Sequence, residues 1–358
     1  MKTLCQRLGL TILAMGLLFS AGELVVRIVM PMPVRLWKLY VPDDVVGCRL
    51  AAGYRMRYQT DEFNTDIVIN PDGLRGRMYP LEKRPGIYRI LILGDSFTLG
   101  LQVAEDQTYC AVLAELLNGV PSPSIKRFEV LNAGIEGFGT HQEYLYGTQL
   151  VARYKPDLVV VAFHPNDIQE ILRGINPIQL RNRLKASFYC LTYLRHLRVL
   201  VTPILSGRSP KASFLELYRD PSGPEVQDGI RRVEDYLLKI RALADGANAR
   251  MLLVLTPMCF EVGREQWVSR GLERLYTADL FQRQMPKLAR HFEEFGLTNG
   301  IPTLALREPF ARQGGHGLYF QLNPHWTPEG HRLAAQEIFR FLRKQELLTP
   351  RPPPIEFR

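Results

Sequence analysis

The sequence predicts an α/β protein of three layers, α/β/α, with a parallel sheet of five strands and an N-terminal membrane helix. Short, continuously apolar runs recur along the chain, and such runs are typical of strands that are covered on both faces. Segments with helical periodicity separate these runs, and this alternation is typical of a parallel sheet flanked by helices. The 358 residues suffice for one large or two ordinary domains.

Composition and pattern divide the chain into four parts. We expect a signal-anchor or transmembrane helix over residues 1–31, a linker with a small β-rich segment over 32–85, the main α/β domain over 86–347 and a Pro-rich tail over 348–358. Within the β-rich segment, Asn70-Pro71-Asp72-Gly73 has the composition of a tight turn.

The N-terminus has the pattern of an export signal. Basic residues precede the uncharged stretch 8–22, which has about the length of a signal-peptide core. The apolar pattern continues to Met30, and Glu23 and Arg27 are spaced i,i+4, so that they can pair at a membrane surface. We therefore expect an uncleaved single-pass anchor with the rest of the chain outside the cytoplasm. Secretion after cleavage behind the small residues 20–22 is the alternative.

Charge and cysteine usage exclude several classes of function. The formal net charge is +9, but no basic run is interleaved with aromatic residues, so we expect no nucleic-acid partner. The five cysteines lack a C-x-x-C spacing, and their odd number gives no complete disulfide framework. A single disulfide is compatible with the sequence. The sequence has no zinc-binding histidine motif and no glycine-rich phosphate loop, so we expect neither a metal nor a cofactor.

The main domain contains five apolar runs that we predict to be strands. They are Arg89 to Leu93, Phe128 to Leu131, Leu158 to Phe163, Met251 to Leu255 and Pro302 to Leu306. Residues 168–227 contain no such run, and we expect a helical insertion over the sheet edge there. This insertion is either a substrate lid or a plain surface excursion.

Capping residues predict the N-termini of two helices. Thr140 and Glu143 have the spacing of a capping box, and Thr327 followed by proline supplies an N-cap and a first-turn proline for the last helix. These caps place Gly137 and His325 in loops that lead from strands to helices. Open α/β sheets bind their ligands in such loops, at the carboxyl ends of the strands.

Ser96 is the candidate nucleophile. It follows the first predicted strand in Gly94-Asp95-Ser96, at the start of a helix, where a backbone N–H stabilises developing negative charge. Gly137, Asn166 and His325 follow three other predicted strands at the same end of the sheet. A serine, a histidine from a distant segment and several N–H donors are the parts of a nucleophilic hydrolase.

Together these segments resemble the four blocks of the SGNH (GDSL) hydrolase superfamily, over roughly residues 89–342. The blocks are Gly94-Asp95-Ser96, the run from Asn132 to Gly137, Asn166-Asp167 and His325. The resemblance is greatest to a membrane-anchored bacterial branch, because the segment 70–76 reads Asn-x-x-Gly-x-Arg-Gly. It implies the SGNH hydrolase fold with a flavodoxin-like sheet.

The resemblance also implies a role for each residue. Ser96 would attack an ester carbonyl, and His325 would take its proton and pass it to the leaving alcohol. The oxyanion would be bound by the N–H groups of Ser96 and Gly137 and by the side-chain amide of Asn166. Gly137 matches the family spacing best, and Gly134 and Gly139 are the alternatives. The family needs no metal. The loop 164–167 departs from the family pattern, since His-Pro stands where Gly-x precedes Asn-Asp.

A second departure concerns the residue that orients the histidine. The family has an aspartate just before the histidine, whereas this chain has Asn323 before His325. The amide oxygen of Asn323, or a backbone carbonyl as the alternative, can accept the imidazole N–H without supplying charge, so we expect a working but slow serine–histidine pair. We expect His331 to lie on a helix surface, and Asp95 and Asp167 to accept backbone N–H groups around their loops.

Three functions follow from these residues. The leading one is hydrolysis of a carboxylic ester, with O-acyl groups of a cell-envelope glycan as the substrate that the location suggests. The first alternative is an O-acyltransferase that passes the acyl group to a sugar hydroxyl. The second is a catalytically inactive glycan-binding module, which the amide of Asn323 motivates.

Overall fold

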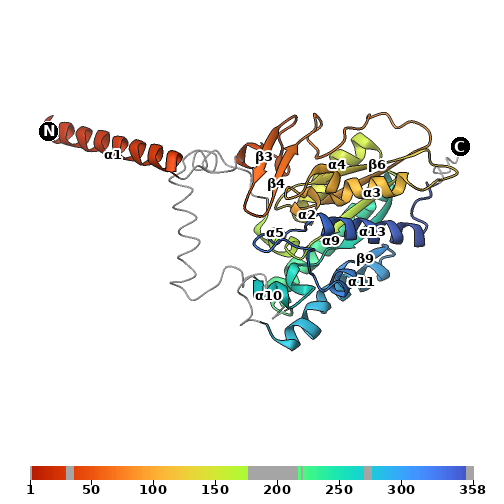
Figure 1. Cartoon of the computed structure of the whole chain (residues 1–358). Coiled ribbons are helices and arrows are strands. Elements are labelled where there is room, and N and C mark those ends of the chain that lie inside the picture. Colours follow the sequence, from red (N-terminus) through yellow and green to blue (C-terminus); the bar gives the residue numbers. More distant parts are fainter. Residues whose placement is uncertain (1, 30–35, 176–216, 219–220, 270–275, 352–358) are drawn as a thin grey trace.

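The computed structural model of the chain describes residues 2–29, 36–175, 217–218, 221–269 and 276–351. Its centre is a parallel sheet with the strand order β6-β5-β7-β8-β9 (Figure 1). The strands are β5 Ile87–Gly94, β6 Arg127–Gly134, β7 Leu158–Phe163, β8 Arg250–Leu255 and β9 Thr303–Ala305. This confirms the predicted α/β fold, its five parallel strands and its flavodoxin-like order.

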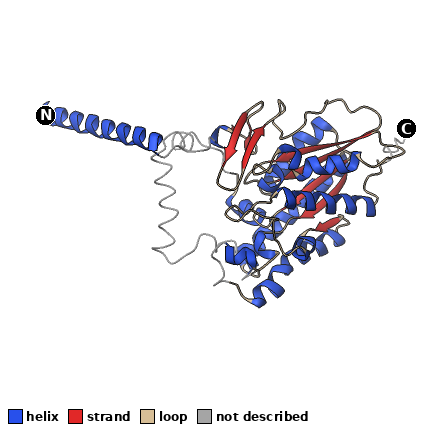
Figure 2. Cartoon of the chain, viewed as in Figure 1, coloured by secondary structure: helices blue, strands red, loops and turns tan. Residues whose placement is uncertain are grey.

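Successive strands are added first on one side of β5 and then on the other, and this order places helices on both faces of the sheet (Figure 2). From β5 it steps outward to β6, and from β6 it returns past β5 to β7. Because both crossovers are right-handed, the two connecting helices lie on opposite faces. On one face α3 Tyr109–Asn118 packs against α13 Pro328–Lys344, and on the other α4 Thr140–Tyr154 packs against α9 Pro224–Gly246.

The other helices of the main domain and of the segment before it lie in the connections. They are η1 Leu36–Lys38, α2 Ser96–Leu99, η2 Glu105–Gln107, α5 Asp167–Arg173, η4 Cys259–Glu261, α10 Glu265–Ser269, the π-helical η6 Leu280–Gln284, α11 Met285–Thr298 and α12 Arg307–Arg312. Of the predicted insertion 168–227, the structure describes α5 and the start of α9, and the greater part lies outside the described residues. The lid that we predicted there is therefore not described.

Two small antiparallel hairpins precede the main sheet. They pair β1 Tyr40–Asp43 with β2 Gly47–Leu50, and β3 Arg55–Gln59 with β4 Asn64–Val68. The predicted turn follows, where the Asn70 side chain accepts the N–H groups of Asp72 and Leu74, both at 3.0 Å. This turn directs Arg75 into the main domain.

Helix α1 Lys2–Val29 contains a span, Gln6–Val29, that is long and apolar enough to cross a membrane. A signal sequence near the N-terminus meets the same criteria of length and apolar composition. Most of its large apolar side chains are exposed, and the predicted pair forms between Arg27 Nε and Glu23 Oε1 at 2.8 Å. The helix thus has the features of a membrane anchor or of a signal sequence.

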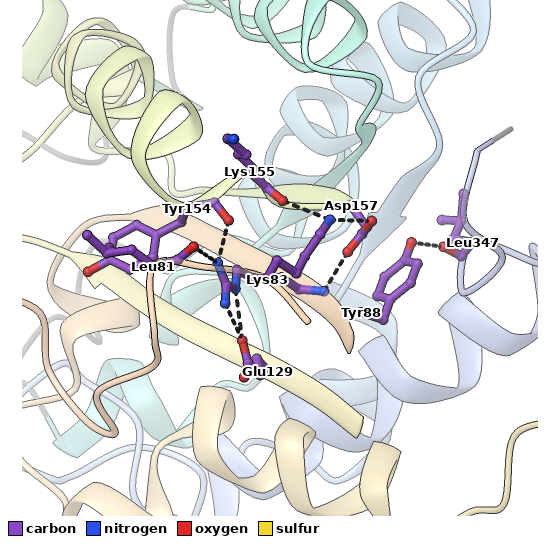
Figure 3. A network of polar contacts seen from close by, with 9 residues as sticks. Leu81, Lys83, Tyr88, Glu129, Tyr154, Lys155, Asp157 and Leu347 are labelled. Carbon is purple, nitrogen blue, oxygen red and sulfur yellow. Dashed lines mark hydrogen bonds and ion pairs between the residues drawn. The ribbon is translucent and has the colours of Figure 1, made fainter. Parts of the chain in front are cut away.

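A buried ion pair holds the amino end of β5 (Figure 3). Arg89 is fully buried, and its guanidinium donates to Glu129 Oε2 and to the carbonyl oxygens of Pro80, Leu81 and Tyr154. All five N–H groups of the guanidinium have an acceptor, which is the condition for burying such a charge. The opposite, carboxyl end of the same strand leads directly into Ser96.

Candidate active site

Ser96 lies at the point where β5 passes into α2. Asp95 is the N-cap of this helix, and its Oδ1 accepts the N–H of Phe97 at 2.8 Å, as predicted for Asp95. Glycine is required on both neighbouring strands. A Cβ at Gly94 would lie 2.1 Å from Thr98 Oγ1, and one at Gly134 would lie 2.3 Å from the Leu99 nitrogen. Only glycine lets α2 approach the strand ends so closely.

The structure brings Ser96, His325 and Asn323 together. Ser96 Oγ lies 2.8 Å from His325 Nε2, and His325 Nδ1 lies 2.6 Å from Asn323 Oδ1. The backbone N–H of His325 also donates to Asn323 Oδ1, at 3.1 Å. A backbone N–H can only donate, so the amide atom that faces His325 is its oxygen. The imidazole proton therefore lies on Nδ1, and Nε2 is free to accept the Ser96 hydroxyl.

The predicted oxyanion donors follow neighbouring strands. Ser96, Gly137 and Asn166 come after β5, β6 and β7, and the carboxyl ends of these three strands lie side by side in the sheet. Gly137 is exposed, and its φ of +75° lies in the region that favours glycine. Asn166 Nδ2 donates to Asp95 Oδ2 at 3.2 Å, which leaves the second amide hydrogen for a ligand.

The loop of His325 is longer than predicted. After β9 the chain forms α12 and then an isolated antiparallel bridge between Tyr319 and Trp326, so His325 does not follow directly from a strand. As predicted, α13 begins at Pro328, and the Thr327 side chain accepts the N–H of Gly330. The bridge and the cap fix the backbone on either side of the histidine.

Aromatic contacts hold the imidazole from the side. The ring of Phe97 stacks on His164 with centroids 4.2 Å apart and contacts His325 at 4.8 Å and Trp326 at 5.1 Å. Burial and the neighbouring His325 lower the pKa of His164 to about 3, so His164 is neutral in this stack. Its Nδ1 lies 3.0 Å from Thr256 Oγ1.

The prediction that His331 lies on a helix surface is wrong. The side chain is buried, Tyr109 N–H donates to its Nδ1 at 3.2 Å, and the two rings stack. The reason is that α13 turns this face toward α3. Burial lowers the pKa of His331 to about 3, and it takes no part in the contact with Ser96.

The capping box predicted at Thr140 and Glu143 is also wrong. The N-cap of α4 is Gly139, and its N–H donates to Gln142 Oε1 at 3.4 Å. The Thr140 hydroxyl donates instead to Asp167 Oδ2 at 3.0 Å, because this buried acceptor lies behind the helix start. Asp167 thus binds a side-chain hydroxyl where we expected a backbone N–H.

Three carboxyl groups are buried beneath the site. Burial raises the pKa of Asp95 to about 7, and burial together with mutual repulsion raises the pKa values of Glu143 and Asp167 well above their ordinary range. Neither oxygen of Glu143 has a hydrogen-bond partner among the described residues. Groups of this kind stabilise the fold only while they are protonated.

Two residues that contact these loops were not among the predicted site residues. Glu62, in the β3–β4 turn, accepts the N–H groups of Leu322 and Asn323, and the Tyr40 hydroxyl donates to Glu136, beside Gly137. Both belong to the segment that we interpreted as a linker with strands. No sequence pattern marks such contacts, because they join positions far apart in the chain.

Arg75 is buried against the end of α2. It donates to the carbonyl oxygens of Leu99 and Val103, both at 2.6 Å, and to that of Gly100. Burial lowers its pKa to about 10, so it stays charged at neutral pH. The Asn-x-x-Gly-x-Arg-Gly segment thus clamps the helix that carries Ser96.

The chain matches the sequence profile of the GDSL-like lipase/acylhydrolase family over residues 92–333. It therefore belongs to this family and is a hydrolase that acts on esters, which confirms the predicted resemblance. Two solved structures similar to it are a catalytic mutant of Axe2, an acetylxylan esterase from Geobacillus stearothermophilus, and the psychrotrophic esterase EstA from Pseudoalteromonas sp..

Axe2 shares 16% identity, with 71% of this chain and 94% of that chain covered and a TM-score of 0.44. For EstA the identity is 14%, the coverage 72% and 98%, and the TM-score 0.41. A search of curated protein sequences finds no significant match.

Replacement of Glu143 tests the buried carboxyl groups. Because the folded pKa is raised, the folded state keeps a proton that the unfolded chain releases, so stability falls as pH rises above about 4.3. Glu143→Gln removes this loss. We expect its Tm to exceed that of the wild type by about 2 to 4 °C or more at pH 7.5, with the advantage shrinking toward pH 4.5.

Thermal unfolding at both pH values measures this difference. Glu115→Gln, on the exposed face of α3, loses the same charge without burial and serves as the control. A Tm advantage of Glu143→Gln that is equal at both pH values would show that Glu143 is ionised in the folded protein.

Proposed function

We propose that the chain cleaves a carboxylic ester through an acyl intermediate on Ser96, with His325 as the base. The observation that carries this proposal is the 2.8 Å contact between Ser96 Oγ and His325 Nε2. Ser96 Oγ attacks the ester carbonyl as its proton passes to Nε2. The imidazolium then gives that proton to the leaving alcohol, and water repeats the two steps to release the acid.

The oxyanion that forms in each step needs preorganised donors. We assign this role to the backbone N–H groups of Ser96 and Gly137 and to the side-chain amide of Asn166. The N–H groups of Ser96 and Gly137 donate to no other described residue, which supports the assignment. One such donor contributes about 2.7 to 4 kcal/mol to transition-state stabilisation.

The amide of Asn323 supports an active enzyme rather than an inactive binding module. In a serine protease, changing the orienting acid to an amide lowered kcat about 10⁴-fold because the histidine took the wrong tautomer. Here the backbone N–H of His325 holds the amide oxygen toward the ring, so the correct tautomer is kept. The enzyme lacks only the charge that would stabilise the imidazolium.

Labelling with a fluorophosphonate tests the nucleophile and the base. The full-length protein in detergent should react with the reagent and turn over p-nitrophenyl acetate, whereas Ser96→Ala should do neither. His325→Ala should slow turnover by at least about 100-fold, because it removes the base. His291→Ala, at an exposed histidine that contacts Glu234, is the matched control.

The proposal fails if the wild type neither labels nor turns over above the Ser96→Ala background. Adding an O-acetylated envelope glycan as donor, with and without a sugar acceptor, then identifies the substrate class. Release of acetate to water supports hydrolysis, whereas acetate that appears on the sugar would replace hydrolysis by acyl transfer.

We further propose that α1 is an uncleaved bacterial membrane anchor and that the catalytic domain lies outside the cytoplasm. The apolar span Gln6–Val29 supports the anchor. In bacteria that express the full chain, we expect the protein in the membrane fraction with its first residues intact, and the domain open to protease in spheroplasts. A soluble mature chain that begins near Glu23 would contradict the anchor.

A further inference from the structure

The β3–β4 hairpin lies outside the region that the family profile matches and reaches the loop of the catalytic histidine. Its turn is closed by a hydrogen bond from the Thr60 N–H to the Phe63 carbonyl oxygen at 2.8 Å. Thr60 Oγ1 also accepts the N–H groups of Glu62 and Phe63, both at 3.2 Å. The backbone that carries Glu62 is therefore fixed by local bonds.

The carboxylate of Glu62 accepts two successive backbone N–H groups of this loop. Leu322 N–H donates to Oε1 at 2.9 Å, and Asn323 N–H donates to Oε2 at 2.8 Å. Hydrogen bonds to an ionised acceptor are stronger than those between neutral groups. The residue that they hold, Asn323, is the one whose side-chain oxygen accepts the His325 Nδ1–H.

Apolar contacts support the same alignment. The ring of Phe63, next to Glu62, packs on Phe320 with centroids 5.2 Å apart. Phe320 N–H donates to the His325 carbonyl oxygen at 3.1 Å. The hairpin turn thus contacts the histidine loop through one ring and one carboxylate, on residues just before the histidine.

We propose that Glu62 is a positioning residue for ester hydrolysis: it holds the Asn323 backbone so that the Asn323 side-chain oxygen faces His325 Nδ1, and it brings a negative charge to a loop whose orienting residue is neutral. This proposal rests on the function proposed for His325 as base. It extends the catalytic machinery to a hairpin outside the family profile.

The negative charge of Glu62 should affect the titration of His325. Two titratable side chains that interact electrostatically with His325 are His164, after β7, and His331, on α13. The pKa of each is lowered to about 3, so both side chains are neutral at any pH well above that value, including neutral pH. Asn323 is neutral as well. A change in the titration of His325 that occurs on losing Glu62, and not on losing the neighbouring Asp61 charge, therefore reports on the Glu62 carboxylate.

Two variants of Glu62 and a matched control test the proposal in the full-length protein. Glu62→Gln keeps the shape and removes the charge, and Glu62→Ala removes both. Asp61→Asn, at the exposed neighbouring residue, loses the same charge and serves as the control. We expect Glu62→Gln to lower kcat for p-nitrophenyl acetate about 10-fold with KM nearly unchanged, and Glu62→Ala to lower it by up to about 100-fold.

The pH profile separates positioning from a merely structural role. Removing a nearby negative charge lowers the pKa of an imidazole, so the acidic limb of kcat/KM should move to lower pH in Glu62→Gln. It should stay in place in Asp61→Asn. Nuclear magnetic resonance of the protein with ¹⁵N-labelled histidine should show the same fall in the pKa of His325, and a weakened Nδ1–H signal. His325→Gln assigns that signal.

A double-mutant comparison gives the sharpest result. In the Asn323→Asp background the orienting group carries its own charge, so Glu62→Gln should cost less than it does in the wild type. Equal fold losses in both backgrounds would mean that Glu62 acts independently of the group at position 323, which would overturn the proposal. The proposal is also overturned if Glu62→Gln matches Asp61→Asn in kcat, pH profile and the His325 signal. The resonance readout holds even if the wild type hydrolyses no ester, and that result would reject the proposed function alone.

Discussion

One oxygen atom, Asn323 Oδ1, accepts two hydrogens from His325, and the chemistry of the site depends on this interaction. The backbone N–H identifies the atom as an oxygen, and the oxygen then requires the ring proton on Nδ1. Only this tautomer leaves Nε2 free to take the proton of Ser96. In the proposed mechanism, this neutral side chain orients His325 but supplies no charge of its own to stabilise the imidazolium.

The rest of the structure serves to bring distant segments to this interaction. Gly94 and Gly134 let α2, the helix that begins at Ser96, pack closely on the strand ends, and Arg75, from the N-terminal segment, donates hydrogen bonds to the end of that helix. Glu62 holds the histidine loop from the same segment. The site is thus shared between the parallel sheet and the small hairpins before it. A hydrolase domain cut at the start of the family profile would lose both of these contacts.

The sheet and the residues at its carboxyl edge could be predicted because their signals are local. A continuous apolar run indicates a buried parallel strand wherever it occurs, and Ser96 and Asn166 directly follow such runs. The direction of a side chain depends on what packs against it. Glu143 and His331 have ordinary helical spacing, yet both are buried. For His331 the reason is that α13 packs on α3. Glu62 contacts a residue 260 positions away, and no local pattern carries that information.

The most direct test of this account is the replacement Asn323→Asp, followed by kcat and the pH profile of kcat/KM. The variant keeps both hydrogen bonds to His325 and adds the missing charge, so kcat should rise about 10-fold, the difference between a charge-assisted and a neutral hydrogen bond. The acidic limb of kcat/KM should move to higher pH, because a carboxylate raises the pKa of the imidazole. An unchanged or lower kcat with an unmoved acidic limb would show that another group orients His325.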